Sequence, residues 1–269
     1  MFLNLRMTQQ QPFSVRCFGT ADGMPSAQRN HAAFLYRLGE TSILVDCGES
    51  VDASFKASGL SYDAIDALII SHLHADHFGG LFMLLQGFWL EGRRKSLTIY
   101  LPEYAIGPLR QMLEAAMLLE ELLQFRLRLL PIPEAEPLSI GQARVRAFRT
   151  SHLDDLRSQL GKKYEMDFAS YCFLIEAGGR RIGHSADLGK PEDLAPLLTQ
   201  PLDLLVCELA HFRPEHLFIY LKLHKIKRVV FVHLARGILQ KFAQVQELAT
   251  TMLPDFSTSF PNDQEEITI

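Results

Sequence analysis

Residues 71–77 read Ser-His-Leu-His-Ala-Asp-His and bring three imidazoles and one carboxylate together within a few positions. They follow an apolar, strand-like run at 67–70, and His72 and His74, two residues apart in an extended chain, point to the same side. Asp76 and His77, which end the segment, fall where a helix is expected to begin. Their side chains can therefore face a second position, different from the one that His72 and His74 face. Imidazole and carboxylate suit Zn²⁺, and also Mn²⁺ or Fe²⁺. The spacing predicts a metal site at a strand end; the alternative is a polar loop with incidental histidines.

The pattern His72-x-His74-x-Asp76-His77 resembles the signature of the metallo-β-lactamase superfamily. Further pieces of this family's sequence follow in the family's order, so the resemblance covers nearly the whole chain. It implies an α/β fold, the four-layer αββα sandwich, with metals at the edge between two sheets and a single domain over residues 1–269. The matching pieces are Phe18-Gly19-Thr20, residues 44–49, Ser151-His152, Ser185-Ala186-Asp187 and Phe231-Val232-His233.

The resemblance also implies a ligand set for two divalent metal ions, with zinc preferred and manganese or iron as alternatives. One metal would be held by His72, His74 and His152, the second by Asp76, His77 and His233, and Asp187 would bridge them. A single histidine at a strand end is usually an ordinary polar residue. Because His152, Asp187 and His233 follow this signature in the family's order, each of them is expected to be a ligand. Asp46 is expected to hydrogen-bond a ligand histidine; the alternative is an aspartate that only stabilises a turn.

The N-terminal half most resembles the tRNase Z-like branch, which also includes cyclic phosphodiesterases. That resemblance is carried by residues 18–26, Arg29-Asn30 and Asp46-Cys47-Gly48-Glu49. It implies a phosphodiester substrate and leaves a homodimer open. Only 34 residues, 153–186, separate His152 from Asp187, too few for the long arm with which tRNase Z grips tRNA. We therefore expect a small-molecule or short nucleotide ester as substrate, with the polar segment 154–167 as a small flap.

A second departure concerns the proton donor. tRNase Z carries a His-Glu-Ala-Thr segment after a strand, and its histidine donates a proton; here Cys207 stands at that position and Glu208 matches the glutamate. We hypothesise that His211, in the loop after Cys207, replaces the missing acid, with His184 as a second candidate. The alternative for both is a surface histidine or one with ordinary hydrogen bonds. The candidate catalytic residues are therefore Asp76, Glu208 and His211.

These residues together indicate a hydrolase that uses a metal-activated water as nucleophile. The preferred interpretation is a phosphodiesterase acting on a small or cyclic phosphodiester. Because one fold hosts many chemistries, hydrolysis of a thioester, lactone or other ester stays open. A mono-iron oxygenase or a metal-bearing binding module is a less favoured alternative. β-Lactam hydrolysis is disfavoured, since Asp187 replaces the thiolate of common zinc β-lactamases.

Short apolar runs bounded by turn residues predict strands, and helical patterns between them indicate two sheets with helices outside. Gly178-Gly179 predicts a tight hairpin. The longest helical pattern runs over 103–124, and residues 262–269 fit an edge strand and a loose tail equally. The predicted strands are 13–18, 42–46, 67–71, 97–101, 143–148, 171–176, 204–208 and 229–233, and the other helices are 78–90, 191–198, 214–225 and 239–252.

Composition adds limits to function and location. The net charge of −4 gives no reason to expect tight, unspecific binding to polyanions. The sequence has neither an apolar run long enough for a membrane span nor a secretory signal pattern, so a cytoplasmic protein is expected. The four cysteines lack CxxC spacing and are expected to be buried free thiols. The basic run Arg93-Arg94-Lys95 is expected to be a solvated face; the alternative for such basic clusters is phosphate attraction near the metals.

Overall fold

Two mixed β-sheets pack face to face in the computed structural model, which describes residues 13–134, 136–164 and 166–269. The first sheet has the order β14 (Glu266–Thr268), β1 (Ser14–Gly19), β2 (Ala33–Leu38), β3 (Thr41–Val45), β4 (Ala67–Ile69), β5 (Leu97–Leu101), β6 (Leu127–Pro131). The second has the order β13 (Ser257–Ser259), β12 (Ile226–Leu234), β11 (Leu202–Leu209), β10 (Arg180–His184), β9 (Tyr171–Ala177), β8 (Ala143–Arg149), β7 (Leu138–Ile140).

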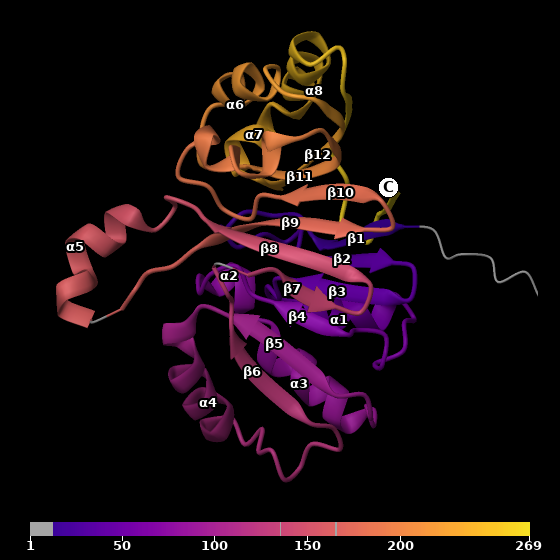
Figure 1. Ribbon diagram of the computed structural model, residues 1–269, viewed down its shortest axis with the longest axis vertical. Coiled ribbons are helices and arrows are strands. Elements are labelled where there is room, and N and C mark those ends of the chain that lie inside the picture. Colours follow the sequence, from indigo (N-terminus) through magenta and orange to yellow (C-terminus); the bar gives the residue numbers. More distant parts are fainter. Residues whose placement is uncertain (1–12, 135, 165) are drawn as a thin grey trace, which may run out of the picture.

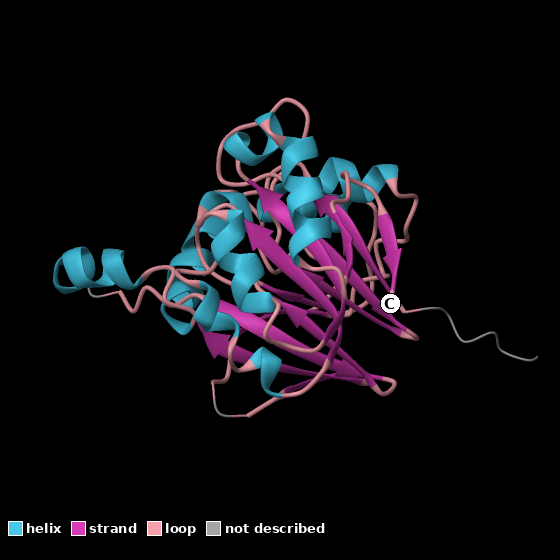
Figure 2. Cartoon of the chain, turned by 90° about the horizontal axis from the view of Figure 1, so that it is seen from above, coloured by secondary structure: helices cyan, strands magenta, loops and turns pink. Residues whose placement is uncertain are grey.

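Helices cover the outer faces of both sheets, which gives the four layers of the predicted αββα sandwich (Figures 1 and 2). The first sheet is covered by α1 (Val51–Ala57), α3 (Leu81–Leu90) and α4 (Ile106–Ala115). On the side of the second lie α6 (Pro214–Leu221), α7 (Arg236–Gln240) and α8 (Phe242–Met252). The short helices are α2 (Ala75–Phe78), η1 (Glu103–Ala105), η2 (Pro191–Leu194) and η3 (Leu197–Thr199), and α5 (Asp154–Tyr164) projects from the body of the molecule.

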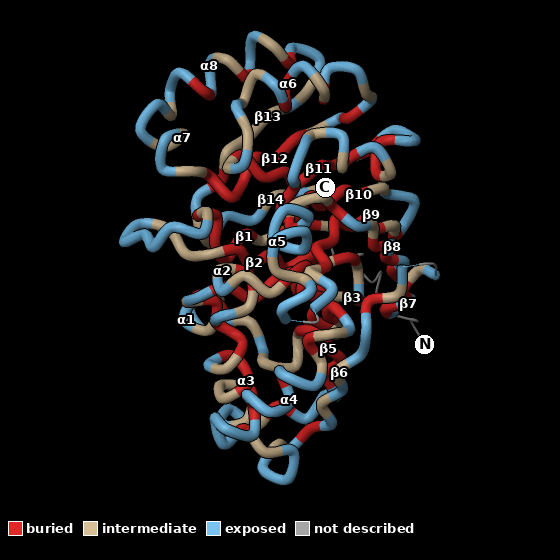
Figure 3. Tube along the Cα trace, turned by 90° about the vertical axis from the view of Figure 1, so that its left-hand side faces the viewer, coloured by how far each residue is buried: buried red, intermediate tan, exposed pale blue. Residues whose placement is uncertain are grey.

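Three layers of apolar side chains hold the sandwich together. One lies between the sheets and includes Tyr36 and Phe173; the other two lie between each sheet and its helices and include Phe88 and Phe231. The central strands are therefore buried on both faces (Figure 3), which explains why they read as continuous apolar runs rather than alternating ones. Hydrophobic burial on this scale is the main term that fixes the strand ends, and hence the site, in place.

The predicted hairpin and the predicted buried free thiols are confirmed. Gly178 (φ 53°) and Gly179 (φ 74°) form the turn of the β9–β10 hairpin, and two positive φ values in succession are what a type I′ turn requires. The C-terminal segment forms the edge strand β14, which pairs antiparallel with β1. All four cysteines are buried and free. Within the described part of the chain, no helix has the length and hydropathy needed to span a membrane.

The helix predictions were wrong in their boundaries. The pattern at 103–124 yields η1 and α4, which ends at Ala115, because Met117 adopts a left-handed conformation (φ 58°) that terminates the helix. The pattern at 78–90 is interrupted at Gly80, where an added Cβ would lie 2.2 Å from the carbonyl oxygen of Gly48. Residues 191–198 form the two short turns η2 and η3 instead of one helix. The polar segment expected to be a flap contains the exposed helix α5.

Candidate metal centre

Residues 71–77 leave the carboxyl end of β4, which lies in the first sheet between the parallel strands β3 and β5. His74 is extended (φ −67°, ψ 143°) and precedes α2, whose first turn holds Asp76. The rings of His72 and His74 consequently lie on one side, with centroids 4.7 Å apart. His72 and His77 are buried. The predicted local geometry of this segment is therefore observed.

Three further side chains come from strand ends of the second sheet. His152 follows β8, Asp187 follows β10, and His233 is the penultimate residue of β12. Ala186 (φ 45°) and His233 (φ 50°) adopt left-handed conformations, which are strained for residues other than glycine. Strain of this kind persists where the surrounding structure enforces it, as it commonly does at functional sites.

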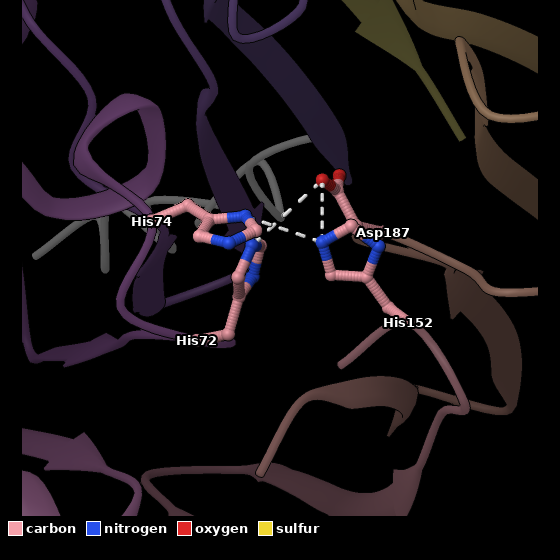
Figure 4. A group of neighbouring side chains, drawn as sticks. All are labelled: His72, His74, His152 and Asp187. Atoms are coloured by element: carbon pink, nitrogen blue, oxygen red, sulfur yellow. Dashed lines mark hydrogen bonds and ion pairs between the residues drawn. The ribbon is translucent and has the colours of Figure 1, made fainter. Parts of the chain in front are cut away.

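The first cluster comprises His72, His74, His152 and Asp187, which point toward one another in Figure 4. One ligand atom from each lies within 4.8 Å of all the others. The Nε2 of His152 is 3.2 Å from the Nδ1 of His74 and 3.5 Å from the Oδ2 of Asp187. The Nε2 of His72 is 3.7 Å from the same carboxylate oxygen. These four atoms could hold one metal ion.

The second cluster comprises Asp76, His77, His233 and again Asp187. The other oxygen of Asp187, Oδ1, lies 3.2 Å from the Nε2 of His77 and 3.3 Å from the Nε2 of His233. The Oδ2 of Asp76 lies 3.3 Å from the Nε2 of His77. Asp187 thus presents one oxygen to each cluster, which is the arrangement of a bridging carboxylate.

Asp46 supports the second cluster from behind. Its Oδ2 lies 2.8 Å from the Nδ1 of His77, and its Oδ1 accepts a hydrogen bond from the backbone nitrogen of Ser71 (2.7 Å). The Ser71 hydroxyl donates to Oδ2 (2.9 Å). A carboxylate on Nδ1 fixes the tautomer in which Nε2 offers its lone pair to the site. The expected hydrogen bond from Asp46 to a candidate ligand histidine is therefore present.

Glu208 and His211 form a pair beside the first cluster. The Oε1 of Glu208 lies 2.9 Å from the Nδ1 of His211 and accepts from the backbone nitrogen of Leu188 (2.8 Å). The Nε2 of His211 is 3.8 Å from the Oδ2 of Asp187. Glu208 is buried, whereas the His211 side chain is 33% exposed. His211 therefore reaches from a loop to the solvent side of the cluster, as the sequence hypothesis requires.

Cys207, at the position of the expected histidine, and His184, the second candidate donor, lie away from the substrate side of the site. Successive residues of a strand face opposite sides, so Cys207 points into the apolar layer beneath α6 and α8 while Glu208 faces the site. His184 is buried between the sheets and lies 2.7 Å from the hydroxyl of Tyr36 through its Nδ1. The proposal of His184 as an alternative acid is wrong, because this side chain is closed off from any substrate.

A groove of about 540 Å³ opens beside Asp76. Its volume is in the range of small-molecule sites. Because Asp76 belongs both to the second cluster and to the wall of this groove, a molecule in the groove would lie next to the cluster. The other lining residues are Gly23, Pro25, His31, Glu49, Ser50, Asp52, Ala75, Gly79, Gly80 and Met83.

Residues 13–217 match the model of the family described as Anti-Pycsar protein Apyc1. The chain belongs to the Apyc1 family. Among curated proteins, it is 31% identical over 141 residues to the ribonuclease Z of Archaeoglobus fulgidus, an alignment that covers 52% of this chain and 45% of that protein. The chain spans less than half the length of this protein and of two other ribonuclease Z proteins that it matches.

Solved structures of the metallo-β-lactamase fold superpose on nearly the whole of this Apyc1-family chain. The protein YhfI of Bacillus subtilis gives a TM-score of 0.76 at 19% identity and covers 95% of this chain and 99% of that one. The short form of human tRNase Z gives 0.71 at 22% identity, with 95% and 99% covered. The Apyc1-family chain thus has the metallo-β-lactamase fold and is similar to tRNase Z in structure and to ribonuclease Z in sequence, as the sequence pattern predicted.

Unpartnered polar atoms test whether metals fit these two clusters. The Nε2 atoms of His72 and His77 and the Oδ1 of Asp187 are fully buried and make no hydrogen bond. Burying such groups without a partner costs free energy, yet here they converge on common points without the alignment that a hydrogen bond requires. Imidazole nitrogens and carboxylate oxygens are the ligands that zinc takes. The donor set in this Apyc1-family chain therefore fits two divalent cations.

The charge states of the first cluster agree with this fit, whereas in the second cluster Asp187 and Asp46 outweigh burial and raise the pKa of His77. Burial lowers the pKa of His152 to about 4 and that of His72 well below its usual value. Burial opposes ionisation of Asp187, but His233 and His77 outweigh it and hold the pKa of this carboxyl well below its usual range. Neutral imidazoles and an ionised carboxylate are the forms that bind metals. Burial likewise lowers the pKa of His211, but the hydrogen bond to Glu208 raises it to about 9.

Two residues that hold the candidate ligands were missed from the sequence. Thr150 donates from its hydroxyl to the carbonyl oxygen of Asp187 (2.9 Å), and Asp193 accepts from the backbone nitrogen of Ser151 (2.9 Å). The only sequence signal for Asp193 is its place in the first turn after Pro191, a pattern that predicts a helix start and nothing about a ligand loop. Both roles depend on segments that meet only in the folded chain.

Proposed function

We propose that this Apyc1-family protein is a dinuclear metal-dependent phosphodiesterase that acts on a small or cyclic phosphodiester. The observation that carries the proposal is the sharing of Asp187, whose Oδ2 faces His72 and His152 while its Oδ1 faces His77 and His233. Shared carboxylates of this kind suit a pair of metal ions that act on one phosphoryl group. The names ribonuclease Z and tRNase Z, carried by relatives, also denote enzymes that cut RNA.

When bound, two divalent cations supply Lewis acidity for the phosphoryl oxygens and lower the pKa of a water molecule. The chain itself positions the ester and handles protons. Asp76 lines the groove, so its carboxylate is placed to orient the attacking water and accept its proton. Glu208 holds the Nδ1 of His211, so that the opposite nitrogen, Nε2, faces the site and is placed to donate a proton to the leaving oxygen.

The proposal includes a cytoplasmic enzyme whose chain forms one domain. Four buried free thiols suit a reducing compartment. Strand β14, near the end of the described chain, pairs with β1 near its beginning, so the first sheet joins the two ends. The second sheet contains β7 to β13. Each cluster combines side chains from both sheets, so neither half of the chain provides a complete cluster alone.

Protein reconstituted with Zn²⁺ or Mn²⁺ is expected to bind two equivalents of metal and to hydrolyse bis(p-nitrophenyl) phosphate. His74→Ala, which removes one ligand of the first cluster, is the matched blank and is expected to lose this turnover. Metal content is measured by elemental analysis after dialysis, and turnover by release of p-nitrophenolate. A protein with two bound metals and no phosphodiesterase activity would refute the substrate class and direct attention to thioesters and lactones.

His211→Ala is expected to slow hydrolysis of an ester with a poor leaving group by about 10² to 10⁴-fold, the range for one lost general acid. Hydrolysis of bis(p-nitrophenyl) phosphate should change far less, because p-nitrophenolate leaves without a proton. The measurement compares the kcat of both esters for the variant and the parent at equal metal content. Equal losses on both esters, or none on either, would remove His211 from the proposed mechanism.

A further inference from the structure

The loops that carry His152 and Asp187 touch each other behind the first cluster. The contact is between Gly189 and Ser151, two residues after one candidate ligand and one residue before the other. An added Cβ at Gly189 would lie 2.4 Å from the Oγ of Ser151 and 2.6 Å from its carbonyl carbon. Only a residue without a side chain permits this approach. The distance between the two loops is therefore set by direct packing, as well as by the metal ion that His152 and Asp187 would share.

The carboxylate of Asp193 lies at this contact and holds both loops. Its Oδ2 accepts from the backbone nitrogens of Ser151 (2.9 Å), Gly189 (2.9 Å) and Lys190 (3.3 Å). The Ser151 hydroxyl lies 2.9 Å from Oδ2 and 3.1 Å from Oδ1. Hydrogen bonds to an ionised carboxylate are about twice as strong as neutral ones. One side chain thus ties the residue before His152 to the residues after Asp187.

Asp193 is itself anchored to a rigid part of the molecule. It belongs to η2, whose next residue, Leu194, is fully buried in the apolar layer between the second sheet and its helices. The backbone nitrogen of Asp193 donates to the carbonyl oxygen of Lys190 (3.1 Å), which closes the turn on itself. The carboxylate therefore acts as a fixed point to which two loops are attached.

Other side chains hold the Asp187 turn from different directions. Glu208 accepts from the backbone nitrogen of Leu188 (2.8 Å), and Thr150 donates to the carbonyl oxygen of Asp187 (2.9 Å). The Glu208 carboxylate bonds to Leu188, Ala210 and His211, which lie outside the His152 loop, and Thr150 contributes a single neutral bond to the turn. Asp193 supplies the charged link between the loops. It holds the turn at Gly189 and Lys190, to which neither the Glu208 nor the Thr150 bond described above extends.

We propose that Asp193 is a positioning residue that sets the separation of His152 from Asp187, and hence the geometry of the first cluster. The inference rests on the proposed dinuclear function. Its effect should fall on one metal, because Glu208 still holds the turn of the shared Asp187 through Leu188, so that loss of Asp193 chiefly displaces His152, a member of the first cluster alone. An aspartate that merely stabilises η2 would instead lower stability without favouring either metal.

Asp193→Ala is expected to weaken the binding of one zinc equivalent by about 10 to 100-fold, the range for losing a partner that orients a ligand, and to leave the other unchanged. Zinc affinity is measured on the full-length protein by competition with a chromogenic chelator. The control is Asp203→Ala. Asp203 accepts from the backbone nitrogen of Arg181 (2.9 Å) and from Lys227 (2.6 Å), at the end of β11 opposite to Glu208. Its removal should lower stability and leave both affinities unchanged.

Two further variants separate positioning from folding. Asp193→Asn retains an oxygen that can accept from the three backbone nitrogens, so it should restore most of the affinity. Asp193→Glu keeps the charge but displaces the carboxylate, so it should weaken the same zinc equivalent even if the alanine variant does not fold. If the parent binds fewer than two zinc ions, the proposed function itself fails. If the parent binds two and the alanine or glutamate variant also binds both with unchanged affinity, or loses both equally, the role of Asp193 is refuted.

Discussion

Replacing Asp187 by alanine is expected to abolish binding at both clusters and to reduce phosphodiester hydrolysis by more than about 10³-fold, or about 4 kcal/mol of transition-state stabilisation. Each oxygen of this carboxylate faces a different cluster. Its Oδ1 lies 3.2 Å from the Nε2 of His77, and its Oδ2 lies 3.5 Å from the Nε2 of His152. Its loss also removes the negative charge that would balance two dications in a buried site. No other described residue belongs to both clusters.

The comparison with single-cluster variants makes this prediction specific. His74→Ala should lose the first metal and His233→Ala the second, each retaining about one equivalent, whereas Asp187→Ala should retain none. Metal content after dialysis against a weak chelator, together with turnover of bis(p-nitrophenyl) phosphate, gives the ranking. Near-ultraviolet circular dichroism checks that the variant is folded. Asp187→Ala protein with a full equivalent of tightly bound metal would contradict the bridging role.

The candidate ligands could be predicted because their information is local. His72 and His74 lie two apart after an apolar strand, and this spacing already places both rings on one side. His152, Asp187 and His233 could be assigned only through the family resemblance, since each alone is a polar residue at a strand end. The structure brings all of these residues together from two sheets. A local sequence pattern cannot predict contacts between segments so far apart in the chain.

The proton donor shows where local patterns stop being sufficient. The sequence placed Cys207 at the position of the expected histidine, and strand alternation then decides that its side chain faces the outer apolar layer. His211 reaches the site because the loop after β11 turns back and Glu208 accepts from its backbone nitrogen (3.1 Å). His184 is excluded as the proton donor because it is buried against Tyr36, a residue 148 positions away in the sequence. Such contacts depend on the packing of the two sheets.

Arg93 was misassigned for the same reason. In the sequence it opens the basic run 93–95, which was expected to be a solvated face. In the structure it is 1% exposed, whereas its neighbour Arg94 is exposed. The guanidinium carbon lies 5.0 Å from the ring centre of Phe88 and 5.5 Å from that of Phe125, beneath the helices of the first sheet. A charge run in a sequence does not reveal which member turns inward.

Arg93 is held by backbone carbonyls, with no direct ion pair to an acidic side chain among the described residues. Its Nε donates to the carbonyl of Lys95 (2.7 Å), and Nη2 donates to those of Ile65 (2.7 Å) and Ser96 (3.0 Å). Nη1 donates to the carbonyl of Tyr62. Burial lowers the pKa of Arg93 to about 10, so the side chain remains charged at neutral pH. The residue therefore joins the loop before β4 to the loop before β5.

We expect Arg93→Ala to lower the free energy of unfolding by about 3 to 5 kcal/mol, because it leaves several carbonyls unpaired and opens a cavity among aromatic rings. Arg93→Lys should recover only part of this, since an ammonium group lacks the planar fork that reaches the separate carbonyls. Urea unfolding of the metal-free protein gives the values without the added stability of bound metal. The adjacent Arg94→Ala removes the same chemical group from an exposed position and should change stability by no more than about 0.5 kcal/mol. Equal unfolding midpoints for the two alanine variants would show that the buried arginine contributes no more than its exposed neighbour.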